Sequence, residues 1–339
     1  MTLIRALFFL VVSVFALQAA KPLDVYLIDV EGGKCVLVVS PSGESLLYDA
    51  GWPGQGGRDN NRIVEAAKAA GLKQIDYLVI SHYDVDHLGD VPALLSAFPV
   101  KHIIDNGSLQ TPGADFERRY KPFAEARDAM NHMTVKPGDK LPVKGVAITV
   151  VSAATKTLQS ALPGAGAPNP VCATTPQKAE LASDREDNMS IGLLFTLGKF
   201  RMLDLADLEA FYSYKLVCPN NLIGTVDVYN VAVHAQEKGI SGVLEPTIRP
   251  RVILVGNGAR KGGDPASWPV MRATPGLEDI WQSHFTTAGG QEKNPPADFI
   301  ANIDPECQGK WLKLSAQPDG SFTMTNGRNG FSKTYKARN

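Results

Sequence analysis

The stretch SHYDVDHLGD, residues 81–90, is the feature that most restricts how this chain can fold. It follows an apolar, β-branched run at 77–80 that predicts a buried strand, and residues 88–98 have the apolar spacing of a helix. Two histidines and two aspartates lie in this strand-to-helix turn: His82, Asp84, Asp86 and His87. Because residues two apart in an extended chain point the same way, the first three can share one side while His87 begins the helix. We therefore expect four ionisable groups to converge on one small volume.

Two interpretations of this turn compete. In the first, Asp86 is a helix N-cap and the histidines are ordinary turn residues. In the second, the groups bind a metal, since two carboxylates this close repel each other unless a cation neutralises them. Imidazole with carboxylate is a normal ligand set for a divalent ion. The dense spacing favours the metal site.

Length and charge limit the classes of function. The chain has 339 residues, 44% of them hydrophobic, which is enough for one large α/β domain or two smaller ones. Because 34 Lys plus Arg stand against 35 Asp plus Glu, no overall field attracts nucleic acid or anionic lipid. Strong nucleic-acid binding is therefore not expected, and an anionic substrate would need a local basic patch.

Residues 1–20 have the character of a secretory leader. Arg5 precedes an apolar stretch at residues 6–17, and the small residues Ala19 and Ala20 follow it. The stretch is short for a membrane span, and no later segment is as apolar. We expect a signal peptide over residues 1–20, a mature chain that begins near Lys21, and a secreted or periplasmic protein without membrane attachment. A retained N-terminal anchor is the alternative.

Export makes disulfides possible among four cysteines: Cys35, Cys172, Cys218 and Cys307. Four cysteines allow several complete pairings, and the sequence does not choose among them. Cys35 lies in the strand-like run KCVLVVS and is expected to stay reduced. The other three lie in loop-like segments, so we expect at least one disulfide among them.

Other predicted strands also end in groups that bind metals. The segments LDVYLIDV, KCVLVVS and ESLLYDA predict an antiparallel meander. The segment NMSIGLLFTLGKFRMLDLADLEAFY predicts a hairpin that turns at residues 197–199 and ends at acidic residues, followed by a helix. The order of strands and helices indicates two sheets with helices outside. The candidate ligands at strand ends are Asp49, Asp204, Asp207 and His234. Each alone is explained equally well as a strand-end or capping residue, but together they form a pattern.

These motifs resemble, in order and spacing, those of the metallo-β-lactamase-fold hydrolases. The resemblance rests on DVYLIDVEGGKCVLVVSPSGESLLYDAG, SHYDVDHLGD, NMSIGLLFTLGKFRMLDLADLE, VDVYNVAVH and RPRVILVGNG. It covers residues 22–265 and is greatest to the ComEC-like branch. It implies an α+β fold, an αββα four-layer sandwich with a site for one or two divalent ions at one edge. We expect a domain over residues 21–265 and a C-terminal extension, residues 266–339, packed on the same domain.

The resemblance also implies a role for each matching residue. The ligands would be His82 and Asp84 for the first metal, Asp86, His87 and His234 for the second, and Asp207 as the bridge. Asp49 would orient a ligand rather than bind metal. Asp86 would also be the catalytic residue that orients the nucleophile. Such a pair of ions, roughly 3.5 to 4 Å apart, clamps the oxygens of a phosphoryl or acyl group.

Two departures from the family pattern concern the first metal. Asp84 replaces the histidine of the commoner motif, and Asn188 stands where many members have another histidine. Carboxylate in place of imidazole enriches the site in oxygen. We therefore expect a weaker first site that accepts Mn²⁺ as well as Zn²⁺. Asn188 and Asn257 are the further candidates for supporting a ligand or contacting the substrate.

The function implied is that of an exported metal-dependent hydrolase acting on a phosphodiester, either a small molecule or a nucleotide-like one. The alternatives are hydrolysis of an amide, lactam or ester, because the fold does not determine the chemistry, and a non-catalytic binding protein that retains the fold. The basic residues nearest the last motifs are Arg249, Arg251, Arg260 and Lys261. The remaining histidines, His102, His132 and His284, fit no ligand motif and are assigned to packing or surface.

Overall fold

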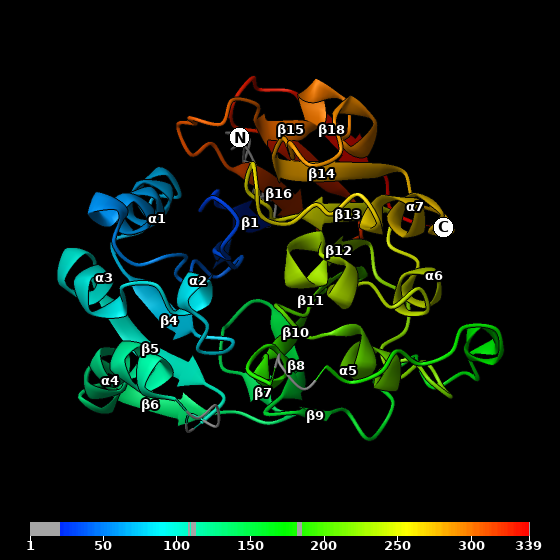
Figure 1. The fold of residues 1–339 in the computed structure, drawn as a ribbon, viewed down its shortest axis with the longest axis horizontal. Coiled ribbons are helices and arrows are strands. Elements are labelled where there is room, and N and C mark those ends of the chain that lie inside the picture. The colour runs from blue at the N-terminus through cyan, green and yellow to red at the C-terminus, as the bar shows by residue number, and fades with distance from the viewer. Residues whose placement is uncertain (1–20, 108, 110–112, 182–184, 339) are drawn as a thin grey trace, which may run out of the picture.

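A computed structural model describes residues 21–107, 109, 113–181 and 185–338. In it the chain forms two β-sheets that face each other, with helices on the outer faces (Figure 1). The signal peptide expected over residues 1–20 lies outside the described residues. Within the described ranges, no helix combines the length and apolar character needed to cross a membrane.

The first sheet has nine strands among the described residues. Their order is β18 (Ser332–Tyr335), β17 (Phe322–Asn326), β16 (Leu312–Ala316), β1 (Leu23–Leu27), β2 (Val36–Val39), β3 (Ser45–Tyr48), β4 (Ile75–Val79), β5 (Val100–Asp105) and β6 (Asn131–Thr134). Strands β1 to β3 form the predicted antiparallel meander. From β3 to β6 the neighbours are parallel, so the chain must cross over between them. The crossovers contain α1 (Arg58–Ala69), α2 (Val85–Leu88), α3 (Val91–Ala97) and α4 (Ala114–Asp128).

The second sheet combines an antiparallel part with a parallel part. Its order in the described ranges is β15 (Ile300–Asn302), β14 (Asp279–His284), β13 (Val252–Val255), β12 (Val228–Asn230), β11 (Phe200–Asp204), β10 (Gly192–Leu197), β8 (Ala147–Ala153) and β7 (Lys140–Leu141), with β9 (Lys156–Thr157) beside β8. The predicted hairpin is confirmed as β10 and β11. It turns at Gly198, where φ is 56° and a Cβ would lie 2.1 Å from the carbonyl oxygen of Pro318, so only glycine fits.

Three separate apolar clusters show how the layers are held together. The first lies between the sheets and joins residues such as Val25 of β1 to Phe195 of β10. The second packs the other sheet against α5 (Ala210–Lys215), α6 (Leu244–Ile248) and α7 (Ser267–Arg272). The third packs the first sheet against α1, α3 and α4. The αββα sandwich predicted from the sequence is therefore confirmed. Short 3-10 helices occur at Gln55–Gly57, Pro170–Ala173, Asp187–Met189, Ala232–Ala235, Glu237–Gly239, Gln291–Lys293 and Ala297–Phe299.

The C-terminal extension supplies strands to both sheets. Strands β14 and β15 continue the parallel part of the second sheet, and β16 to β18 extend the first sheet beyond β1. Strand β16 pairs with β1 over its whole length, from Leu23 opposite Ala316 to Leu27 opposite Leu312. Strands β16 to β18 thus cover what would otherwise be an open edge of the first sheet, at β1.

A glycine interrupts the helix predicted over residues 88–98. Helix α2 ends at Leu88, and α3 begins at Val91. Between them Gly89 has φ 61°, and a Cβ there would lie 2.4 Å from the carbonyl oxygen of Ala50. The break lets the Ala50 N–H donate to the carbonyl of His87 at 2.8 Å. This contact ties the HYDVDH turn to the end of β3.

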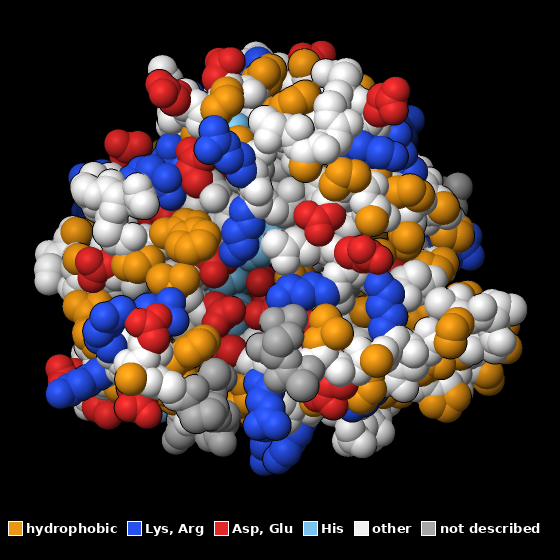
Figure 2. Space-filling model, in the orientation of Figure 1, with side chains coloured by type: hydrophobic (Ala, Val, Ile, Leu, Met, Phe, Trp, Pro, Cys, Tyr) orange, Lys and Arg blue, Asp and Glu red, His pale blue; other side chains and the backbone are white. Residues whose placement is uncertain are grey.

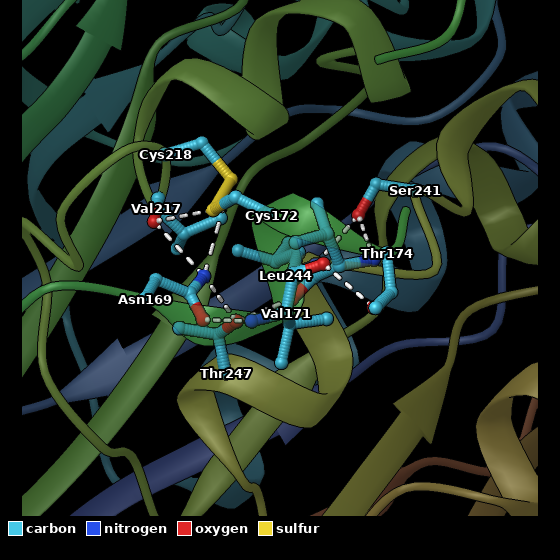
Figure 3. Close-up of a disulfide and its surroundings, with 10 residues drawn as sticks. Asn169, Val171, Cys172, Thr174, Val217, Cys218, Ser241, Leu244 and Thr247 are labelled. Atoms are coloured by element: carbon cyan, nitrogen blue, oxygen red, sulfur yellow. Dashed lines mark hydrogen bonds between the residues drawn. A yellow bond between two sulfur atoms is a disulfide. The ribbon is translucent and has the colours of Figure 1, made fainter. Parts of the chain in front are cut away.

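Among the described residues, one disulfide connects the 3-10 helix Pro170–Ala173 with the segment that follows α5. Cys172 in the 3-10 helix Pro170–Ala173 is bonded to Cys218 (Figure 3). Asn169 supports the same junction by donating to the carbonyl of Val217 at 3.0 Å. Cys35 is buried and free, and Cys307 is free and partly exposed. The expectations of at least one disulfide and of a reduced Cys35 are both confirmed.

Removing this disulfide is expected to lower stability without altering the fold. The two cysteines are 46 residues apart. Cross-linking a loop of this length reduces the conformational entropy of the unfolded chain, which contributes roughly 2–4 kcal/mol. Replacing both cysteines with serine should lower the free energy of unfolding by that amount, as measured by urea denaturation. Unchanged stability in the double variant would show that the bond adds nothing in solution.

Candidate metal centre

The predicted ligands meet at one edge of the sandwich, where strands of both sheets end. From the first sheet, β4 leads into the turn and the helix α2 that carry residues 82–87. From the second sheet, β11 ends shortly before Asp207, and β12 leads into the 3-10 helix that contains His234. Figure 2 shows histidine surface in a hollow at the middle of this face, with acidic and basic side chains around it. Residues far apart in the sequence thus form one site.

One group of side chains matches the predicted second metal site: Asp86, His87, Asp207 and His234. His234 Nε2 lies 3.2 Å from Asp86 Oδ2 and 3.2 Å from Asp207 Oδ2. His87 Nε2 lies 3.4 Å from Asp207 Oδ2 and 3.3 Å from His234 Nε2. All four residues are buried. Two imidazole nitrogens and two carboxylates therefore face one point, which is the arrangement that a divalent ion requires.

A second group lies beside the first and consists of His82, Asp84 and Asp187. His82 Nε2 lies 3.6 Å from Asp84 Oδ2 and 3.9 Å from Asp187 Oδ1. Asp207 is close to His82 as well as to His87, with ligand atoms of all three within 4.8 Å of one another. Its carboxylate can therefore bridge the two groups. The group at His82 has one imidazole and two carboxylates, so it is rich in oxygen.

The structure places Asp187, and not Asn188, beside His82. The Asn188 side chain donates to Glu209 Oε2 at 2.9 Å, and its Oδ1 accepts from the Glu209 N–H at 3.4 Å. Both asparagine and aspartate lie in the short 3-10 helix Asp187–Met189, where neighbouring side chains point in different directions. The acidic residues before Met189 indicate a candidate ligand in the sequence. Which of them faces His82 depends on the tertiary structure.

Hydrogen bonds behind the ligands hold the histidine rings in the orientation that metal binding needs. His87 Nδ1 lies 2.9 Å from Asp49 Oδ2, and Asp49 also accepts from the Ser81 N–H and hydroxyl, both at 2.7 Å. His234 Nδ1 donates to the carbonyl of Gly256 at 3.0 Å. Each bond leaves Nε2 directed into the centre as an acceptor. Asp49 therefore has the supporting position that the sequence predicted.

Two buried atoms of the centre have no hydrogen-bond partner among the described residues. They are His82 Nε2 and Asp207 Oδ1. A buried polar atom without a partner costs about 1–3 kcal/mol unless something else satisfies it. A divalent ion bound by both groups would satisfy these atoms. The residues present therefore fit one or two metal ions.

The pKa values follow from the crowding of opposite charges. Burial lowers the pKa of His87, but the carboxylates around it, led by Asp207, raise it well above its ordinary value. Burial raises the pKa of Asp207, but His234 and His87 hold it well below its ordinary value. Burial together with the Asp207 charge raises the pKa of Asp187 to about 7. In the metal-free protein, the positive charge of protonated histidines therefore offsets the charge of the carboxylates.

Replacing Asp49 with asparagine is expected to weaken metal binding by about 10–100-fold, the usual effect of losing such a supporting partner. The NH₂ group of the asparagine would face either the Ser81 N–H or the His87 Nδ1–H. Two donors cannot bond to each other, so one hydrogen bond is lost. Calorimetric titration of metal-free protein measures the affinity. Asp76→Asn is the control, because Asp76 accepts from the N–H and hydroxyl of Ser45 at the other end of β4. Equal affinities of Asp49→Asn and wild type would rule out the role.

Two lysines lie at the centre, on different ligands. Lys261 Nζ contacts Asp86 Oδ2 and lies over the Trp52 ring, 4.8 Å from its centroid. Lys238 Nζ contacts Asp187 Oδ2. Both side chains are part-exposed, 31% and 25% respectively. From the sequence alone, Lys261 is only one of the basic residues nearest the last motifs.

Several other predicted candidates have different surroundings. Asp204 is bound to Lys34, at 2.7 Å from both carboxylate oxygens, and to Asn230. Asn257 donates to the carbonyls of Gly258 and His284 and so stabilises its own loop. These side chains are already satisfied by protein groups and need no substrate.

The predicted basic cluster does not form, because its members lie at opposite ends of β13. Arg251 precedes β13 and pairs with Glu278 at 2.6 Å, whereas Lys261 follows β13 and reaches the metal centre. Two of the three unassigned histidines are packing residues, as expected. His102 stacks on Tyr77 with the ring centroids 5.1 Å apart, and His132 Nε2 lies 2.9 Å from Asp105.

Residues 28–166 match the sequence profile of the metallo-beta-lactamase superfamily. The match includes the whole HYDVDH turn. No curated protein matches the chain.

Solved structures of similar fold share little sequence with it. A diphosphatase of the PhnP family is 12% identical, with 87% of this chain and 98% of that chain covered and a TM-score of 0.43. Igni18, a metallo hydrolase of Ignicoccus hospitalis, is 12% identical, with coverage of 87% and 100% and a TM-score of 0.40. The diiron β-hydroxylase CmlA of Streptomyces venezuelae is 15% identical, with coverage of 77% and 48% and a TM-score of 0.37. The chain spans 52% of a CmlA mutant and 61% of a Cronobacter sakazakii metallo-β-lactamase.

Proposed function

We propose that this protein is an exported metal-dependent hydrolase that cleaves a phosphodiester in a small or nucleotide-like substrate. The observation that carries the proposal is the pair Lys261 and Lys238, one on each of two ligand groups in the same hollow. When the ligands hold metal, their charge is offset, so the attraction of Asp86 for Lys261 and of Asp187 for Lys238 would be weaker, and both ammonium groups would also donate to an anion in the hollow. A phosphodiester carries the negative charge that such a site binds, whereas a neutral lactam, amide or ester does not.

The chain's own groups would divide the work as follows. His82, Asp84 and Asp187 would hold one divalent ion, and Asp86, His87 and His234 a second, with Asp207 between them. Bound Zn²⁺ or Mn²⁺ would polarise the phosphoryl oxygen and lower the pKa of a water molecule. Asp86 would orient that water through its free oxygen lone pairs, and Lys238 and Lys261 would donate hydrogen bonds to the non-bridging oxygens. Asp49 would keep the His87 ring in place.

The experiment is a substrate panel assayed with Zn²⁺ and with Mn²⁺. We expect turnover of a nitrophenyl phosphodiester and of dinucleotides, and none of a chromogenic cephalosporin, a thioester or a peptide amide. Turnover of an acyl substrate alone would favour the rival hydrolase. Metal binding without turnover of any substrate would favour the binding protein. Because the net charge of the chain is −1, affinity for the phosphodiester should fall only modestly with added salt.

Replacing Lys261 with methionine is expected to reduce kcat/KM for the phosphodiester roughly 10- to 150-fold, because a hydrogen bond to a charged group contributes about 1.5–3 kcal/mol. Lys313→Met is a closely matched control. Lys313 also pairs with an aspartate, Asp24 at 2.9 Å, lies over an aromatic ring, and is 30% exposed. Steady-state kinetics should show no change in the control. Equal losses in both variants would mean that Lys261 acts on stability and not on substrate.

We also propose that the protein is exported and that it belongs to the ComEC-like branch of the superfamily. The disulfide Cys172–Cys218 supports an oxidising compartment, since such bonds persist mainly in exported proteins. N-terminal sequencing of the protein from an exporting host should find a start near Lys21. A soluble periplasmic product that still begins with Met1 would refute cleavage.

A further inference from the structure

A second group of ligand-type side chains lies outside the metal centre described above. It consists of Asp29, Glu31, His284 and Cys307. Asp29 and Glu31 follow β1, His284 ends β14, and Cys307 lies between β15 and β16. One ligand atom from each lies within 4.8 Å of the others. The group therefore brings the loop after β1 together with the C-terminal segment.

His284 has the tautomer and the environment of a metal ligand. Its Nδ1 lies 3.1 Å from the carbonyl oxygen of Phe285, and since only a donor can bond to a carbonyl, Nδ1 carries the proton. In the neutral ring Nε2 is then an acceptor. The residue is 0% exposed, and Nε2 has no hydrogen-bond partner among the described residues. The closest charged atom, Glu31 Oε2, is 3.9 Å away, beyond hydrogen-bond distance.

Cys307 has more acceptors around it than its one proton can satisfy. Its Sγ lies 2.9 Å from Asp29 Oδ2 and 2.8 Å from Glu31 Oε1. A thiol donates one hydrogen bond, so with both carboxyl groups ionised one of these contacts brings two electron-rich atoms together without a proton between them. A metal ion bound to Cys307, Asp29 and Glu31 together would remove the repulsion between their electron-rich atoms.

The charges of the group leave room for a divalent ion. Arg62 lies against the group, with Nη1 donating to the Asp29 carbonyl at 2.9 Å and Nη2 to the Cys307 carbonyl at 3.3 Å. Its guanidinium also lies 3.4 Å from Glu31 Oε1 and 3.5 Å from both Asp29 Oδ2 and Cys307 Sγ, so it offsets part of their charge. Its single positive charge faces the two carboxylates of Asp29 and Glu31. With Cys307 as a thiol the sum is therefore −1; with a thiolate and a divalent ion it is zero. Neutrality matters here because Asp29 and His284 are buried.

We propose that Asp29, Glu31, His284 and Cys307 form a structural zinc site separate from the catalytic centre. One thiolate, one imidazole and two carboxylates suit Zn²⁺ in four-coordination, and the thiolate disfavours Mn²⁺ and Mg²⁺. The site fastens the C-terminal segment to the loop after β1. That loop continues to Lys34, whose N–H donates to the Asp86 carbonyl at 3.0 Å. The zinc thereby steadies a loop that touches the catalytic centre.

The test uses the full chain loaded with Co²⁺ in place of Zn²⁺. The proposed catalytic ligands contain no sulfur, so a near-ultraviolet thiolate-to-cobalt band reports only Cys307. We expect the band in wild type and in the control Cys35→Ser, and its loss in Cys307→Ser. Elemental analysis adds a count: in a His87→Ala/His234→Ala background one zinc per chain should remain after dialysis, and adding Cys307→Ser should remove it.

Two results would overturn the proposal. One is wild-type cobalt protein without a thiolate band, or with a band that Cys307→Ser leaves intact. The other needs no variant, so it stands even where Cys307→Ser fails to fold: we expect Zn²⁺ to slow alkylation of Cys307 at least tenfold relative to chelator-treated wild type. Equal alkylation rates with and without Zn²⁺ would refute the site.

Discussion

In the His87→Ala variant, the tightly bound metal ion and the hydrolytic activity should both be lost. His87 supplies one of two imidazoles in the group with Asp86, Asp207 and His234, and it stands between both metal groups. Loss of a partner behind a ligand already costs about 10–100-fold in affinity, so loss of the ligand itself should cost more than about 100-fold. Elemental analysis after dialysis measures retained metal. His132→Ala is the matched control, a part-buried imidazole bonded to Asp105.

Further variants separate the two ions. Asp84→Ala and Asp187→Ala should release mainly the weaker ion, because we expect a site built largely from carboxylates to hold Zn²⁺ less tightly and to accept Mn²⁺ as well. His234→Ala should release the tight ion. Asp207→Ala should release both, since a bridging carboxylate offsets the repulsion between two cations. If wild type keeps no metal even in excess Zn²⁺ or Mn²⁺, the hydrolase proposal fails and the binding-protein alternative replaces it.

The affinity for metal should depend steeply on pH. Burial lowers the pKa of the centre's histidines, but nearby carboxylates outweigh it, so His82, His87 and His234 all have pKa values above the ordinary value of 6.5. Metal binding requires neutral imidazole and therefore displaces these protons. Each displaced proton makes the affinity change about tenfold per pH unit. We therefore expect the affinity for metal to fall at least about tenfold between about pH 8 and pH 6, as measured by titration calorimetry.

Stability should show the opposite trend in metal-free protein. A histidine whose pKa is raised by folding stabilises the fold fully below its unfolded pKa, about 6.5, and this stabilisation disappears as the pH rises through the folded value. Metal-free protein should therefore lose stability above neutral pH, where metal-loaded protein gains it. The difference in Tm between the two forms should widen from pH 6 to pH 8. A constant difference, with a pH-independent affinity, would mean that the histidines are neutral before metal binds.

Local sequence was sufficient where neighbouring residues make the structure. The HYDVDH turn was predicted because backbone geometry relates residues two to five positions apart, and the strand before it is apolar. The hairpin at Gly198 and the meander of β1 to β3 were predicted for the same reason. The break at Gly89 was not predicted, because it depends on the close approach of the Ala50 backbone, which residues 88–98 do not indicate.

Long-range contacts could not be predicted in the same way. Asp187 and Asn188 are both polar and adjacent, and only the packing of their 3-10 helix against Glu209 turns the asparagine away and the carboxylate toward His82. Likewise, the four basic residues from 249 to 261 look like one cluster in the sequence, but β13 carries Arg251 and Lys261 to opposite ends.

The sequence by itself determined the candidate ligand types, their local spacing, the two-sheet architecture and the edge where the candidate ligands meet, because those depend on periodicity and on short turns. The tertiary structure alone decided which cysteine pairs with Cys172, which lysines reach the centre, and that His284 meets Asp29 and Cys307. These residues are up to 278 positions apart. Their proximity follows from the order in which the strands pair, and no local pattern encodes that order.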